Sequence, residues 1–121
     1  MGTFTQLQIG DQEGQRFEEV DALVDTGATF TVMPASMMRR LGVVPRRRVS
    51  FRLANNAIEE MDVGVTIVRF DGHESITSVA FGGEGRYLMG TLTLGDMLLA
   101  ADPISKRLVP VEGLLMRHER A

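Results

Sequence analysis

The chain has 121 residues, contains no cysteine, and has only two histidines, His73 and His118. The absence of cysteine excludes disulfides, thiol nucleophiles and every zinc or iron–sulfur site that uses a cysteine ligand. Two histidines leave little for a histidine-rich metal site, so we expect no metal and no cofactor. These absences exclude functions that need a thiol and argue against those that need a histidine-rich metal site.

Long apolar runs and an excess of positive charge are also missing. No apolar segment approaches the length of about 18 residues that a membrane span needs. The N-terminus shows no basic-then-apolar signal pattern. The formal net charge is −3, which argues against a primary role on nucleic acid or on an anionic membrane. We therefore expect a cytoplasmic protein with no nucleic-acid or membrane partner.

The length is that of one ordinary domain, and we expect residues 1–121 to form a single unit. Apolar residues make up 44% of the chain and charged residues 24%, which is typical of folded proteins. Such a chain is too short to build two lobes around a cleft by itself. A second copy would have to supply the other wall of any such cleft.

Thirteen glycines divide the chain into short segments, most of which are rich in β-branched and apolar residues. The predicted strands cover residues 4–9, 16–24, 29–33, 46–53, 58–70, 75–81, 87–89, 107–111 and 114–117. Asn55-Asn56 and Asp71-Gly72 are tight-turn signals between strands. Many short strands at this spacing predict an all-β fold with a closed or nearly closed β-barrel.

Two short helices interrupt the predicted strands. The first covers residues 34–41, because Pro34 suits a first helical turn and Gly42 suits the position just after the end. The second covers residues 91–99 and follows Gly90, with Thr91 or Thr93 as its N-cap.

The segment Asp25-Thr26-Gly27-Ala28 follows the apolar residues 22–24. An ionised carboxylate is rarely placed where it can lose water unless it is hydrogen-bonded or has a function. The Thr26 hydroxyl can bond a neighbouring backbone group, and Gly27 allows a turn and a close approach of another backbone. Ala28 keeps the entry to the carboxylate small. Asp25 is therefore either held by local hydrogen bonds or a candidate functional residue.

This segment resembles the active-site loop of the retropepsin-like aspartic proteases, in which Asp-Thr/Ser-Gly-Ala/Ser follows apolar residues. The β-rich segment and the short helix that come next are in the order found in that family. Leu88-Met89-Gly90 and the helix after it resemble the segment that lies beside the catalytic loop. The hairpin 49–58 resembles the flap, whose substrate-binding residues are then Ala54, Asn55, Asn56, Ala57 and Ile58. The resemblance covers residues 16–110 and is closest to prokaryotic stand-alone, single-domain members.

The resemblance implies an aspartic endopeptidase that acts on peptide or protein substrates. Asp25 is then the catalytic residue, and Thr26, Gly27 and Ala28 support its loop. The apolar cleft would be lined by Val24, Val32, Ile58, Leu88, Met89 and Gly90. Because Asp-Thr-Gly occurs once in the chain and the reaction needs two carboxylates, the second must be Asp25 of another copy. We therefore expect a symmetric homodimer.

Alternative interpretations remain open for the same residues. Asp25 could be a turn-forming residue whose carboxylate caps the local backbone. The chain could also be a catalytically silent dimerisation or peptide-binding module that keeps the fold, because fold alone does not fix function. A third alternative is a monomer that matures only inside a longer chain.

Overall fold

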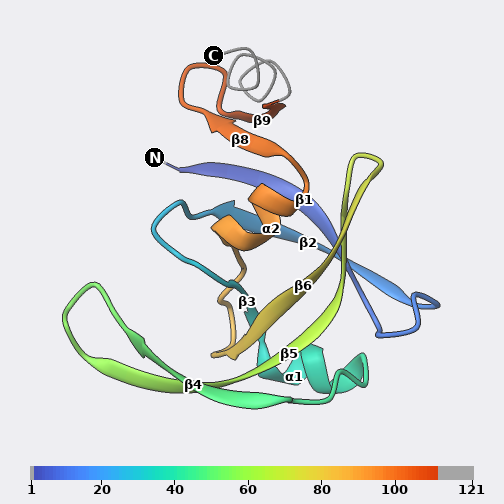
Figure 1. Cartoon of the computed structure of the whole chain (residues 1–121), viewed down its shortest axis with the longest axis vertical. Helices are drawn as coiled ribbons and strands as arrows, with labels where there is room; N and C mark the ends of the chain where they lie inside the picture. The colour runs from blue at the N-terminus through green and yellow to red at the C-terminus, as the bar shows by residue number, and fades with distance from the viewer. Residues whose placement is uncertain (1, 112–121) are drawn as a thin grey trace, which may run out of the picture.

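The computed structural model describes residues 2–111 (Figure 1). The elements in chain order are β1 (Thr3–Gly10), β2 (Phe17–Val24), β3 (Thr31–Pro34), α1 (Ala35–Arg40), β4 (Arg47–Arg52), β5 (Ile58–Phe70), β6 (His73–Gly82), β7 (Leu88–Met89), α2 (Thr91–Asp96), β8 (Leu99–Asp102) and β9 (Arg107–Pro110). These elements confirm an all-β fold with two short helices. The strand predicted at 114–117 and His118 lie outside the described residues.

The main sheet has the strand order β1-β2-β7-β3-β6-β5-β4, and β1 also pairs with β5. This additional pairing joins Gln8 to Arg69 and Ile9 to Val68. It turns the sheet into a closed ring from which β4 projects, hydrogen-bonded to β5 (Figure 1). Strands β8 and β9 form a separate hairpin close to β1. The closed ring agrees with the retropepsin-like architecture that the sequence predicts.

The larger hydrophobic core lies inside the ring and is closed by the two helices. Met37 and Met38 of α1 and Leu94 of α2 are buried in it together with Leu7 and Met89. Burying these side chains removes apolar surface from water, and each Å² removed stabilises the folded state by about 25 cal/mol. This burial is the main term that stabilises the fold. Most of the methionines within residues 2–111 are therefore buried and fill space in the core.

A second, smaller core lies between the ring and β4. Its buried residues are Val32, Met61, Val63 and Ala80, and partly buried Phe30, Val49, Phe51 and Leu88 pack against it. The inward side chains of β4 thus hold the projecting hairpin against the ring. This packing fixes where the β4–β5 hairpin stands relative to the Asp25 loop.

The structure corrects several predicted element boundaries. The second helix ends at Asp96, and Leu99 belongs to β8. Its N-cap is Gly90, with no side-chain cap bond, so the prediction of Thr91 or Thr93 as the cap is wrong. Thr93 is turned inward, where its hydroxyl meets other buried hydroxyls.

The first helix and the turns are closer to prediction. Pro34 ends β3 and is the N-cap of α1 instead of lying in its first turn. Gly42 has φ +74° just past the helix, as predicted for its end. Strand β5 has the predicted bounds, and Asp71-Gly72 forms the predicted turn with both φ angles positive.

Candidate active site

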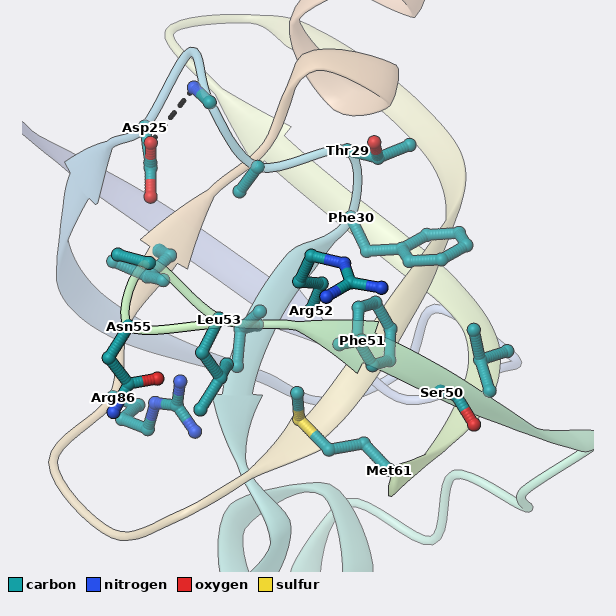
Figure 2. A pocket seen from close by; sticks show the side chains of 16 residues that line it. Asp25, Thr29, Phe30, Ser50, Phe51, Arg52, Leu53, Asn55, Met61 and Arg86 are labelled. Atoms are coloured by element: carbon teal, nitrogen blue, oxygen red, sulfur yellow. Dashed lines mark hydrogen bonds between the residues drawn. The ribbon is translucent and has the colours of Figure 1, made fainter. Parts of the chain in front are cut away.

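Asp25 lies directly after β2 and is held in place by backbone hydrogen bonds. Its N–H donates to the carbonyl oxygen of Met89 at 2.9 Å. Its Oδ1 accepts the N–H of Gly27 at 2.9 Å, which Figure 2 shows as a dashed line. Its carbonyl oxygen accepts the N–H of Ala28 at 3.1 Å. One carboxylate oxygen is thus anchored, while Oδ2 makes no hydrogen bond within residues 2–111. The half-buried carboxylate therefore has one oxygen free to meet a ligand in the cleft.

The two-residue strand β7 lies between β2 and β3 and supports the Asp25 loop. It pairs in parallel with β2 and antiparallel with β3. Directly after it, the N–H groups of Thr91 and Leu92 donate to the carbonyl oxygens of Ala28 and Thr29. A Cβ added to Gly90 would lie 2.4 Å from the carbonyl carbon and oxygen of Phe30. Only glycine allows this crossing of two backbones.

A network of three buried threonine hydroxyls stabilises this crossing. Thr31 Oγ1 accepts the N–H of Gly90 at 3.1 Å and lies 2.6 Å from Thr93 Oγ1. Thr77 Oγ1 lies 3.3 Å from the same Thr93 atom. Sequence reasoning missed this network, because a buried threonine in a strand looks like any other β-branched residue.

The β4–β5 hairpin stands where the flap is predicted, across a cleft from the Asp25 loop, and is called the flap below. At its tip, the N–H of Leu53 donates to the carbonyl oxygen of Ala57 at 2.8 Å, and the N–H of Asn56 donates to the carbonyl oxygen of Leu53 at 2.9 Å. Asn55 Oδ1 accepts the N–H of Ala57 at 3.0 Å. Asn56 has φ +69°, a left-handed conformation that asparagine tolerates better than most residues. Asparagine thus makes a tight flap tip without glycine.

Between the flap and the Asp25 loop lies a cleft of about 980 Å³. The predicted site residues that line it are Asp25, Gly27, Ala28, Val32, Ala54, Asn55 and Leu88. The predicted residues that do not line it are Val24, Thr26, Asn56, Ala57, Ile58, Met89 and Gly90. The last two are buried behind the cleft, and Ile58 is 64% exposed on the flap. The exposed Thr26 and the buried Val24 instead border a smaller hollow near Lys106.

The cleft also contains aromatic and cationic residues that the sequence analysis did not single out. Phe30 and Phe51 form an edge-to-face pair with ring centroids 5.5 Å apart. The Arg47 guanidinium, outside the cleft lining, lies 5.5 Å from the Phe30 centroid. The lining also includes Arg52 and Arg86 (Figure 2). In the sequence, these two arginines are marked only by their positive charge beside the flap and the Leu88 segment. Charged residues are too common on protein surfaces to identify a site.

Within residues 2–111, no group of three or more histidine, aspartate or glutamate side chains is arranged to hold a metal ion. None of the helices in that range is both long and apolar enough to cross a membrane.

The family model described as gag-polyprotein putative aspartyl protease matches residues 5–95. This range contains the Asp25 loop, the flap and the Leu88-Met89-Gly90 segment. The chain therefore belongs to this family of retropepsin-like aspartyl protease domains. A search of curated proteins found no match.

Proposed function

We propose that this chain is one half of a homodimeric aspartic endopeptidase. The observation that carries the proposal is the half-buried Asp25 carboxylate, anchored through one oxygen and facing a 980 Å³ cleft beneath a hairpin flap. A carboxylate in a cleft, fixed by backbone bonds that set its direction, suits the activation of a water molecule. The family membership supports the same chemistry.

The proposed reaction uses two Asp25 side chains that face each other across a two-fold axis. Two adjacent carboxylates cannot comfortably both ionise, so the pair holds one shared proton and titrates as a unit. The ionised carboxylate removes a proton from a water molecule as that water attacks the peptide carbonyl. The protonated carboxyl then gives its proton to the leaving nitrogen as the C–N bond breaks. The products are a carboxylic acid and an amine, and the pair regains one proton.

The dimer follows from the number of carboxylates that one chain supplies to the cleft. Asp25 is the only acidic residue among those that line the cleft of the described chain. A symmetric pair of chains brings two such residues to one axis without any further sequence requirement. Thr26, exposed beside Asp25, would brace the loop of the opposite subunit.

The cleft favours an extended peptide with apolar side chains beside the scissile bond. Val32, Leu88 and the Phe30–Phe51 pair offer apolar walls. An extended chain lying between the flap and the Asp25 loop can also hydrogen-bond to exposed backbone, which gives affinity that tolerates many sequences.

The test is cleavage of a peptide library by wild type and Asp25→Asn, with oligomeric state measured by sedimentation velocity. The variant should remain a folded dimer and lose cleavage, because it cannot supply the carboxylate. Asp21→Asn is the matched control, since Asp21 is exposed on β2 four residues earlier and does not line the cleft. Cleavage retained by Asp25→Asn would refute the proposal. A wild-type dimer that binds peptides without cutting them would instead indicate a silent binding module.

A further inference from the structure

The charged lining of the cleft is unbalanced in favour of cations. It contains two guanidinium groups, Arg52 and Arg86, and a single carboxylate, the catalytic Asp25. The chain as a whole carries a net charge of −3, so this local excess of positive charge runs against the general trend. In the proposed dimer, each half of the cleft would carry the same two cations.

Of the two cations, Arg86 is better placed to bind a charged group of a ligand. Its side chain is 36% exposed, whereas Arg52 is exposed on the flap, where water and salt screen its charge. The Arg86 stem lies over two glycines, because a Cβ added to Gly83 would lie 3.6 Å from Arg86 Cδ and one added to Gly82 would lie 3.8 Å from Arg86 Cβ. The stem thus runs close along this glycine-containing segment before the side chain reaches the cleft lining.

The guanidinium is only partly satisfied by the protein. Its Nη1 donates to both oxygens of Glu59 on the flap, at 3.2 and 3.4 Å. Within residues 2–111, its Nη2 and Nε make no hydrogen bond. A guanidinium can present a planar fork of donors to a carboxylate, and here donors remain free for such a contact. A bound peptide would displace water from them, so an apolar side chain at this place would leave them without partners, and a neutral amide would offer a single uncharged acceptor oxygen.

Arg86 is also close to the reacting centre along the chain. It precedes Met89, whose carbonyl oxygen accepts the Asp25 N–H, by three residues. At about 3.3 Å per extended residue, this separation is at most roughly 10 Å. An extended substrate spans the same length in about three residues, which sets the range of positions around the scissile bond that we consider for Arg86.

We propose that Arg86 is a specificity-determining residue that selects substrates with an aspartate or glutamate within three positions of the scissile bond. The inference rests on the proposed function, in which the cleft binds the peptide substrate. Glu59 keeps the guanidinium partly neutralised when the cleft is empty, and it competes with the substrate carboxylate when the cleft is filled. Two-fold symmetry extends the preference to both sides of the bond.

The test uses octapeptides with a central Phe-Leu pair, in which Glu or the isosteric Gln is scanned through the three positions on each side. Binding is measured by fluorescence anisotropy on the non-cleaving Asp25→Asn protein, and cleavage is measured separately on wild type. We expect at least one Glu peptide to bind about tenfold more tightly than its Gln twin, as charge-assisted hydrogen bonds imply. The difference should shrink in high salt.

Two further variants distinguish recognition of the substrate by Arg86 from a merely structural role of the Arg86–Glu59 ion pair. Both are made in the Asp25→Asn background. Arg86→Gln and Glu59→Gln break the same pair, so a structural role predicts that both change binding in the same direction. Recognition of the substrate by Arg86 predicts opposite results: Arg86→Gln removes the preference for Glu peptides, and Glu59→Gln increases it severalfold. Arg39→Gln, an exposed position on α1 far from the cleft lining, should leave the preference unchanged.

The outcomes distinguish this inference from the proposed function. Glu and Gln peptides that bind and are cut equally would overturn the inference and leave the endopeptidase standing. A Glu preference that depends on Arg86, without cleavage by wild type, would support the inference and overturn the endopeptidase. A protein that neither binds nor cuts any of the peptides would overturn both. If Arg86→Gln does not fold, Glu59→Gln still decides the question, because Glu59 is paired with Arg86 and not with Arg52: an increased Glu preference supports the inference, and an unchanged one overturns it.

Discussion

Single residues decide how closely the Asp25 loop is held. Gly90 lets the chain after β7 cross the backbone of Phe30 at a distance that excludes any side chain. Thr31 meets the Gly90 N–H with its hydroxyl, so the crossing is both close and hydrogen-bonded. A buried donor without such a partner would cost about 1–3 kcal/mol. The position of Asp25 thus depends on residues that never touch a substrate.

Two glycines of the same region give a matched test of this interpretation. Gly90→Ala forces its Cβ into the Phe30 backbone and should lower the free energy of unfolding by roughly 3 kcal/mol. Gly95→Ala in α2 meets nothing within 4 Å and should raise it by about 0.5–1 kcal/mol. Urea denaturation measures both values. Equal effects of the two substitutions would show that the crossing is not the reason for glycine at position 90.

At the scale of elements, the flap is a hairpin whose tip is set by asparagine. Asn55 accepts the Ala57 N–H through its side chain, and Asn56 takes the left-handed backbone conformation. Phe51 and Val49 of β4 hold the base of the flap on the small core. The flap therefore combines an anchored base with an exposed tip, which suits an element that must admit a peptide.

Substitution at the tip should loosen the flap without unfolding the ring. Asn56→Val puts a β-branched residue at positive φ and should cost about 1–2 kcal/mol locally. The amides of Leu53 and Asn56, which donate the turn hydrogen bonds, should then exchange faster with deuterium. Asn56→Gly is the control and should keep their protection, since glycine accepts this conformation. Unchanged exchange in Asn56→Val would show that the turn does not depend on residue 56.

At the scale of the whole molecule, the proposed activity belongs to a pair of chains. Each chain contributes one Asp25 to the cleft that it lines. Association and activity should therefore be coupled, and dilution below the dissociation constant of the dimer should reduce activity per chain.

Mixing wild type with Asp25→Asn tests this coupling directly. After equal amounts exchange subunits, about a quarter of the dimers contain two wild-type chains. Because a mixed dimer has one catalytic carboxylate, the total activity should fall to about half of that of the wild-type chains assayed alone at a saturating concentration. Activity that stays proportional to the amount of wild type would mean that one chain is sufficient.

The stability of the whole molecule should fall in acid. The side-chain hydrogen bonds from Arg40 lower the pKa of Glu18, the Gln15 N–H lowers the pKa of Asp11, and the Ile104 N–H lowers that of Asp102. A carboxyl with a lowered pKa in the folded state stabilises the protein above its unfolded pKa. That stabilisation is lost as the pH falls through the folded value.

The free energy of unfolding should therefore be nearly constant between pH 7 and about 5 and decrease below about pH 4. Glu18→Gln should lower it at neutral pH by at most about 1 kcal/mol, because the pair with Arg40 is partly exposed. The wild-type and Glu18→Gln curves should converge as the pH is lowered. Urea titrations at a series of pH values measure this, and parallel curves would contradict the assignment.

Much of the fold could be predicted from local sequence signals. The bounds of β5, the Asp71-Gly72 turn and Gly42 after α1 follow from periodicity and from residues that adopt positive φ. The cap of α2 could not be predicted, because Thr93 looks like a cap in sequence but its hydroxyl is used by Thr31 in the core. Tertiary contacts overrode the local preference there.

The candidate site divides in the same way. Asp25 and its loop were identifiable from sequence, because an acidic residue between apolar residues and a glycine is a local pattern. Arg86 and Glu59 were not, since they lie 27 residues apart in the chain and meet only when the flap packs over the ring. Likewise, Leu88 reaches the cleft while its neighbour Met89 faces the core. Adjacent strand residues point to opposite faces, and only the fold decides which face is the cleft.

The sequence by itself thus determined the class of fold and singled out one catalytic candidate, from which the proposal of a second chain was made. These depend on residue types and spacings that are local along the chain. The tertiary structure alone decided which side chains line the cleft, why position 90 must be glycine, and which cations lie in the cleft lining. These depend on contacts between distant segments, and such contacts form only when burial of the core brings the segments together.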